Sequence, residues 1–86
     1  MADRRVTQSG KNNEGDITAL CNPTQFWSPR PKLSAISDIE NAIHVYYVDR
    51  AGYRSNVQVI ADPDGKYLRT TADRTSANNL ANLPDC

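Results

Sequence analysis

The side chains best suited to nucleophilic or metal chemistry in this 86-residue chain are two cysteines, Cys21 and Cys86, and one histidine, His44. Cys21 and His44 could form a nucleophile pair, and all three could bind a metal ion. No CxxC or HxxxH spacing supports either hypothesis. We therefore interpret Cys21 as a small buried thiol and His44 as an imidazole at the end of a strand.

The compartment decides the expected state of the two cysteines. No positively charged segment followed by an apolar run opens the chain, so we expect no secretory signal and a cytoplasmic location. In a reducing cytosol both thiols are expected to be free. The alternative is a Cys21–Cys86 disulfide, which would attach the C-terminal tail to the body of a small domain.

Other motifs with known chemistry are weak or missing. Asp62-Pro63-Asp64-Gly65 carries two carboxylates, but Lys66 stands where a calcium-binding loop needs its third ligand, so the segment indicates a hairpin turn. The four glycines are scattered and make no phosphate-binding loop. With one histidine and two glutamates, the chain has few groups for acid–base catalysis. An enzyme is therefore the less favoured hypothesis, with no catalytic residue, metal or cofactor indicated.

Composition limits both the fold and the function. Apolar residues make up 38% of the chain, enough for one small core, so we expect a single domain over residues 1–86. Ten basic and ten acidic residues cancel, which argues against a purely electrostatic binder of nucleic acid or membranes. No apolar run approaches the roughly 20 residues that a membrane-spanning helix needs.

Periodicity predicts five strands and one helix. Apolar residues at helical spacing, Leu33, Ile36, Ile39 and Ile43, predict a helix over 33–43, with Ser34 or Ser37 capping its start. The prolines in 26–32 argue against regular structure there, and Phe26 and Trp27 are expected to close one end of the core, with an aromatic binding platform as the alternative. The irregular tail is expected to be pinned by Leu80 and Leu83. The predicted strands are 4–9, 16–21, 44–49, 53–61 and 66–72.

These elements predict an α+β domain with the order ββαβββ. Short turns between neighbouring strands favour a mostly antiparallel sheet of about five strands, with the helix packed on one face. We expect the face toward the helix to carry Val45, Tyr47, Val57, Val59 and Leu68. The opposite face is then expected to carry His44, Tyr46, Arg54, Asn56, Gln58, Tyr67, Arg69 and Thr71.

The polar face of the sheet is the best candidate for a contact surface. Arginine and tyrosine are enriched at binding hot spots, so our expected binding residues are Tyr46, Arg54, Gln58, Tyr67 and Arg69. The favoured function is a small non-enzymatic interaction module that binds a protein partner or a second copy of itself. A weak single-stranded nucleic-acid binder using the same face is the alternative. A merely solvated polar face also remains open, and no membrane contact is expected.

Four short segments near the C-terminus form a distinctive pattern: Tyr67-Leu68-Arg69-Thr70, Ala72-Asp73, Asn78-Asn79-Leu80 and Leu83-Pro84-Asp85-Cys86. Together with Asp16-Ile17-Thr18-Ala19, Trp27 and Tyr46-Tyr47-Val48, this pattern resembles a small bacterial family known as domain of unknown function 3892. The segment 22–32 is longer and richer in proline than is usual there. The resemblance implies that the tail belongs to the fold and that the setting is a bacterial or phage cytosol. It implies no catalytic residues.

Overall fold

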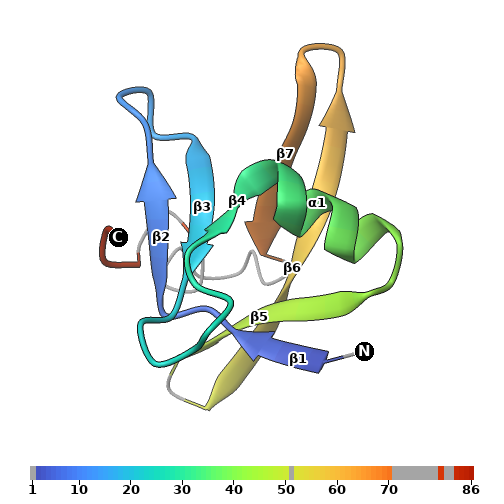
Figure 1. Ribbon diagram of the computed structural model, residues 1–86. Helices are drawn as coiled ribbons and strands as arrows, with labels where there is room; N and C mark the ends of the chain where they lie inside the picture. Colours follow the sequence, from blue (N-terminus) through green and yellow to red (C-terminus); the bar gives the residue numbers. More distant parts are fainter. Residues whose placement is uncertain (1, 51, 71–79, 81–82) are drawn as a thin grey trace.

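The computed structural model describes residues 2–50, 52–70, 80 and 83–86 of the chain. In this part of the chain, seven strands and one helix form two sheets with a helix beside them (Figure 1). The elements are β1 (Ala2–Arg5), β2 (Gln8–Lys11), β3 (Ile17–Cys21), β4 (Arg30–Pro31), α1 (Lys32–Glu40), β5 (His44–Arg50), β6 (Tyr53–Asp62) and β7 (Gly65–Thr70).

The α+β class with one helix is confirmed, but the single sheet is wrong. One sheet has the order β1-β5-β6-β7 and the other has the order β2-β3-β4. The strand predicted over 4–9 divides at Val6 and Thr7, because the Val6 N–H donates to the Tyr47 carbonyl (2.7 Å) and the Thr7 N–H to the Cys21 carbonyl (2.9 Å). Its two halves therefore pair with different strands, and β1 pairs parallel with β5.

Most predicted strand pairings are confirmed. β2 and β3 pair antiparallel, as do β5 with β6 and β6 with β7. The turn predicted at Asp62–Gly65 joins the last two strands, with Asp62 accepting a hydrogen bond from the Asp64 N–H (2.9 Å) and Gly65 at φ 130°. The two-residue strand β4 was not predicted. It pairs with Ala19 and Leu20 at the edge of its sheet, where a proline is tolerated.

Helix α1 begins one residue earlier and ends three residues earlier than predicted. Pro31 occupies its N-cap and no side chain caps it, so the expected serine cap is wrong. Leu33 is 78% exposed and Ile43, beyond the helix, is 46% exposed. The helix instead buries Ala35, Ile36 and Asp38. The predicted stripe fails at both ends because Leu33 faces away from the core and the helix ends at Glu40, before Ile43.

The core lies among α1, the two sheets and the C-terminal tail. Trp27 is buried and packs edge-on against Tyr46, with ring centroids 5.6 Å apart. Phe26 is 91% exposed, so only one of the two aromatic residues closes the core as expected. The buried apolar side chains are Val6, Ile17, Leu20, Cys21, Trp27, Ala35, Ile36, Tyr46, Val48, Val57, Leu68, Leu80 and Leu83.

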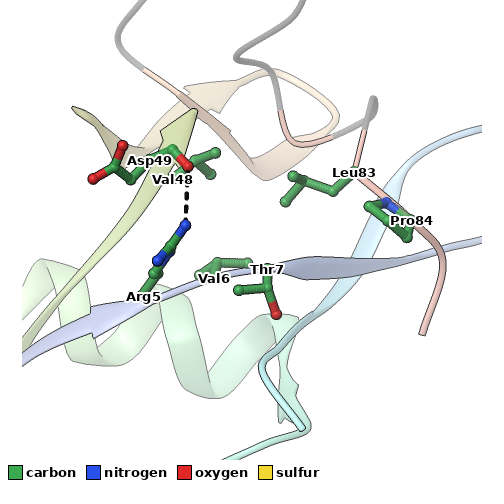
Figure 2. A pocket seen from close by; sticks show the side chains of 7 residues that line it. All are labelled: Arg5, Val6, Thr7, Val48, Asp49, Leu83 and Pro84. Atoms are coloured by element: carbon green, nitrogen blue, oxygen red, sulfur yellow. Dashed lines mark hydrogen bonds between the residues drawn. The ribbon is translucent and has the colours of Figure 1, made fainter. Parts of the chain in front are cut away.

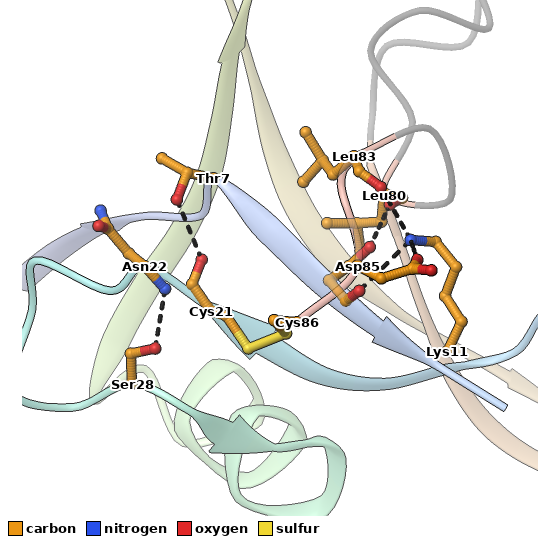
Figure 3. Close-up of a disulfide and its surroundings, with 10 residues drawn as sticks. Thr7, Lys11, Cys21, Asn22, Ser28, Leu80, Leu83, Asp85 and Cys86 are labelled. Carbon is orange, nitrogen blue, oxygen red and sulfur yellow. Dashed lines mark hydrogen bonds and ion pairs between the residues drawn. A yellow bond between two sulfur atoms is a disulfide. The ribbon is translucent and has the colours of Figure 1, made fainter.

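A disulfide joins Cys21 of β3 to Cys86, which overturns the expectation of free thiols (Figure 3). The tail also bonds to β2: the Ser9 hydroxyl donates to the Leu80 carbonyl (2.6 Å), and Lys11 Nζ pairs with the Asp85 carboxylate (2.7 Å). Ser9 and Asp85 form a parallel bridge. The predicted pinning by Leu80 and Leu83 is confirmed, whereas Thr71 and Asn78-Asn79 lie outside the described residues.

Candidate functional site

The expected contact residues divide between the two faces of the four-stranded sheet. Gln58 lies opposite Arg69, and directly opposite residues of an antiparallel pair share a face. Arg54 lies on the same face by alternation along β6, as does Tyr67 along β7. We call this side, away from the core, the outer face. The fifth residue, Tyr46, is completely buried on the core side.

Placing Tyr46 on the contact face is therefore wrong, and the error is a register shift of one residue in β5. Tyr46 and Val48 point into the core, whereas Val45 and Tyr47 are half-buried on the outer face. A shift of one residue exchanges every side chain of a strand between faces. Tyr46 points inward because its hydroxyl bonds to Asp38 of the helix (2.6 Å).

Asp38 is the centre of a buried polar network. Arg30 donates from Nε (2.9 Å) and Nη2 (3.0 Å) to the two Asp38 oxygens, and the Tyr46 hydroxyl donates to the same carboxylate. Burial alone would raise the pKa of Asp38, but the hydrogen bonds from Arg30 and Tyr46 and the charge of Arg30 hold that pKa below its ordinary value. The carboxylate therefore stays ionised inside the protein.

The partners of Asp38 are also tuned by the network. The hydrogen bond to Asp38 raises the pKa of Arg30. Burial, followed by the hydrogen bond to Asp38, raises the pKa of Tyr46, and a hydrogen bond from Arg4 Nη1 to the Tyr46 hydroxyl (3.0 Å) opposes that rise. Tyr46 thus stays protonated between a carboxylate and a guanidinium. The hydrogen bonds among Arg30, Asp38 and Tyr46 fix the positions of these side chains, so we assign the network a structural role.

On the outer face, Arg54 is already engaged. Its Nη2 pairs with the Asp3 carboxylate at 3.0 Å, and its guanidinium carbon lies 4.1 Å from the centre of the Tyr47 ring. Its Nε donates to Asn56 (3.3 Å). Such ion-pair and cation–π contacts stabilise the association of β1, β5 and β6. Arg54 is therefore better explained as a cross-strand residue than as a free contact.

The β6–β7 hairpin carries the unengaged part of the outer face. Gln58 and Arg69 are cross-strand partners, and Ile60 and Tyr67 are the next pair on the same face. Tyr67 is 38% exposed, and Arg69 is exposed. Within the described part of the chain, the side chains of Gln58, Tyr67 and Arg69 make no hydrogen bond or ion pair. We call Gln58, Ile60, Tyr67 and Arg69 the hairpin patch.

Two hollows lie beside β1. One, of about 480 Å³, lies between β1, β5 and the tail, where Val6, Val48 and Leu83 face one another and Arg5 Nη2 donates to the Asp49 carbonyl (Figure 2). The other, of about 340 Å³, lies between β1 and the loop 22–27. Its lining residues are Asp3, Arg4, Arg5, Asn22, Thr24, Gln25, Trp27 and Tyr47.

The chemistry first considered for Cys21 and His44 does not survive. The disulfide removes the Cys21 thiol from any pair with His44 and from any metal site. His44 Nδ1 is buried and has no hydrogen-bond partner among the described residues. Across the same residues, no group of three or more histidine, cysteine, aspartate or glutamate side chains could hold a metal ion.

Sequence reasoning missed Arg4, Arg30, Asp38 and Tyr47. Asp38 alone could have been recognised from the sequence. It stands three residues after Ala35, and this spacing places its carboxylate on the same face of the helix as a small residue suited to close packing. Arg4 and Arg30 stand in segments whose pairing depends on distant residues, so their sequence carries no comparable signal. For Tyr47, the sequence predicts the face toward the helix, which is the wrong face.

Comparisons with known proteins give one finding. A family model described as "Protein of unknown function (DUF3892)" matches residues 4–84, nearly the whole chain. No curated protein and no solved structure matches. In the described residues, no helix is long and apolar enough to cross a membrane.

Proposed function

Because this chain belongs to the DUF3892 family, whose description assigns no function, we propose a function from its geometry: a small interaction module that binds a protein partner through the hairpin patch. The observation that carries the proposal is the set of unengaged polar groups of Gln58, Tyr67 and Arg69 around the apolar Ile60 on one face. Tyrosine and arginine around an apolar centre are typical of protein-binding surfaces.

The form of the hairpin supports this proposal. β6 and β7 pair over six residues each, and their core side is fixed by Val57 and Leu68, which are buried. The patch is thus held by a regular two-stranded ladder, so its backbone needs little further ordering when a partner binds. A rigid scaffold lowers the entropic cost of association. A second copy of the chain is one partner that this surface would suit.

Single-stranded nucleic acid remains the alternative ligand. Tyr67 offers a ring for stacking and Arg69 a guanidinium for a phosphate. Two features weigh against it: the chain has no net charge, and the Arg54 guanidinium already covers one side of the Tyr47 ring. The sequence predicts a location in the cytoplasm of a bacterium. The disulfide weighs against a reducing compartment, because disulfides persist chiefly in oxidising ones.

The test compares the wild type with a Gln58→Ala/Tyr67→Ala/Arg69→Ala variant as immobilised bait. Bound material from a host lysate is recovered with and without nuclease, and the purified chain is analysed by sedimentation. A matched control carries Asn13→Ala/Glu14→Ala in the exposed loop between β2 and β3. Thermal melting of all three proteins establishes that each is folded.

The proposal predicts a protein, or self-association, that survives nuclease and is lost only in the hairpin variant. Nucleic acid recovered by the wild type and lost in the same variant would favour the alternative, with an affinity that falls steeply with salt. Equal recovery by the hairpin variant and the wild type would mean that the patch is ordinary solvated sheet surface.

A further inference from the structure

We propose that the hollow between β1 and the loop 22–27 binds a carboxylate anion, with Arg4 as the residue that holds it. This inference is independent of the hairpin patch. Arg4 and Arg5 both line the hollow with one acid, Asp3, but the Arg5 guanidinium is directed to the other hollow, where it donates to the Asp49 carbonyl. Asp3 is already paired with Arg54 at 3.0 Å, so the charge of Arg4 is not neutralised by the acid that lines the hollow.

Arg4 is a half-buried cation that has no carboxylate partner among the described residues. Its guanidinium carbon lies 5.5, 5.7 and 5.9 Å from the ring centres of Trp27, Tyr46 and Phe26. Aromatic rings stabilise a cation but accept no conventional hydrogen bond from its edge. Arg4 Nη1 donates to the Tyr46 hydroxyl (3.0 Å), and no other hydrogen bond or ion pair of this side chain occurs within the described residues.

The buried network explains why Asp38 does not neutralise Arg4. Both oxygens of the Asp38 carboxylate accept hydrogen bonds from Arg30, and one accepts from Tyr46 as well. Arg4 reaches this carboxylate only through the Tyr46 hydroxyl, whose own proton is directed to Asp38. The network thus holds two guanidinium groups for one carboxylate. The second carboxylate is the group that we expect the hollow to receive.

The walls of the hollow favour a carboxylate over a larger anion. A guanidinium has five N–H donors in one plane, and its free edge matches the two oxygens of a carboxylate. Trp27 and Tyr47 supply apolar surface to the hollow, and Thr24 and Gln25 supply polar groups. Asn22 keeps the loop in place, because its Oδ1 accepts from the Thr24 N–H (3.2 Å) and its Nδ2 donates to the Arg5 carbonyl (3.1 Å). The site is therefore preformed.

Trp27 makes the test direct, because it is the only tryptophan of the chain and it lines the hollow. The intact oxidised protein is titrated with sodium acetate, benzoate and phosphate at constant ionic strength in sodium chloride, and Trp27 fluorescence is followed. Each titration is repeated by amide chemical-shift mapping. The variants are Arg4→Gln, Arg4→Lys and Gln25→Ala, and the matched control is Arg69→Gln on the hairpin patch.

We expect saturable binding of acetate and benzoate that is weakened about tenfold or more in Arg4→Gln and unchanged in Arg69→Gln. Arg4→Lys keeps the charge but not the planar pair of donors, so it is expected to weaken binding as well, which keeps the test informative if Arg4→Gln unfolds. Shifts should concentrate in 3–5 and 22–27. Equal binding by the Arg4 variants and the wild type, or a response that chloride reproduces, would overturn the proposal. Tighter binding of phosphate than of either carboxylate would overturn the choice of anion.

Discussion

Opening the Cys21–Cys86 disulfide is expected to lower the free energy of unfolding by about 4 kcal/mol. The bond joins residues 65 positions apart, and the loss of chain entropy in an unfolded loop of this length corresponds to about 4 kcal/mol at 25 °C. The core of a domain this small supplies only about 3–5 kcal/mol of net stability. Reduction is therefore expected to leave a folded protein with only about 3–5 kcal/mol of net stability, roughly half that of the oxidised protein.

The native tail should keep its contacts after reduction, because Ser9 and Lys11 bind it independently of the sulfur atoms. The Ser9 hydroxyl reaches the Leu80 carbonyl, and Lys11 Nζ reaches both the Leu83 carbonyl (2.9 Å) and Asp85. The effect of the disulfide thus lies mainly in the unfolded chain. The free energy of unfolding should therefore fall more steeply with urea concentration in the reduced protein, because its unfolded state exposes more surface.

The assay is urea unfolding followed by Trp27 fluorescence, with and without reductant. A Cys21→Ala/Cys86→Ala variant should unfold like the reduced wild type and should not respond to reductant. Counting free thiols in denatured, unreduced protein establishes the starting state. The same unfolding midpoint for oxidised and reduced wild type would refute the loop-entropy reasoning. Two free thiols in the unreduced protein would refute the bond itself.

The remaining predictions concern the buried network and the core. Asp38→Asn should destabilise the fold by about 3 kcal/mol at pH 7, because it leaves the Arg30 charge without its partner. Because the pKa of Asp38 is lowered in the folded protein, its carboxylate stabilises the wild type above about pH 4, and this stabilisation is lost as the pH falls through the folded-state pKa. Urea unfolding at a series of pH values should show this loss in the wild type but not in Asp38→Asn. Tyr46→Phe should cost about 1.5–3 kcal/mol. Since the pKa of Tyr46 is raised, stability should fall above about pH 10 in the wild type, and calorimetry should show a smaller fall in the variant. Leu20→Ala, at a fully buried site, should cost about 2–5 kcal/mol in thermal unfolding.

The parts of the fold that depend on neighbouring residues were predictable. β5 and β6 follow from their β-branched and aromatic residues, and β7 from the turn before it. The division of the first predicted strand at Val6 and Thr7 was not predictable, because both residues are compatible with a strand. What separates them is the choice of distant partners, Tyr47 for one and Cys21 for the other.

The disulfide shows a similar limit. Two cysteines allow only one disulfide within the chain. Whether that disulfide forms is predicted from the compartment and not from geometry, because the sequence does not show how far apart the cysteines lie. The structure brings Cys86 to β3 because the preceding tail lies along β2, through the bridge between Ser9 and Asp85. That alignment buries Leu80 and Leu83 as well. Both leucines were visible in the sequence, whereas the path of the chain between them and the sheet was not.

The assignment of residues to the two faces of the sheet is correct where a turn fixes the register and wrong where none does. The hairpin turn at Asp62–Gly65 fixes the pairing of β6 with β7, so Gln58, Tyr67 and Arg69 share the face on which they were placed. β5 instead follows the helix, and each of its two possible faces offers one tyrosine and one valine. Tyr46 is distinguished from Tyr47 by its contacts in the core, a hydrogen bond from its hydroxyl to the Asp38 carboxylate and edge-on packing with Trp27. Adjacent tyrosines therefore have opposite roles, one holding the buried network and the other exposed to the hollow beside Arg4.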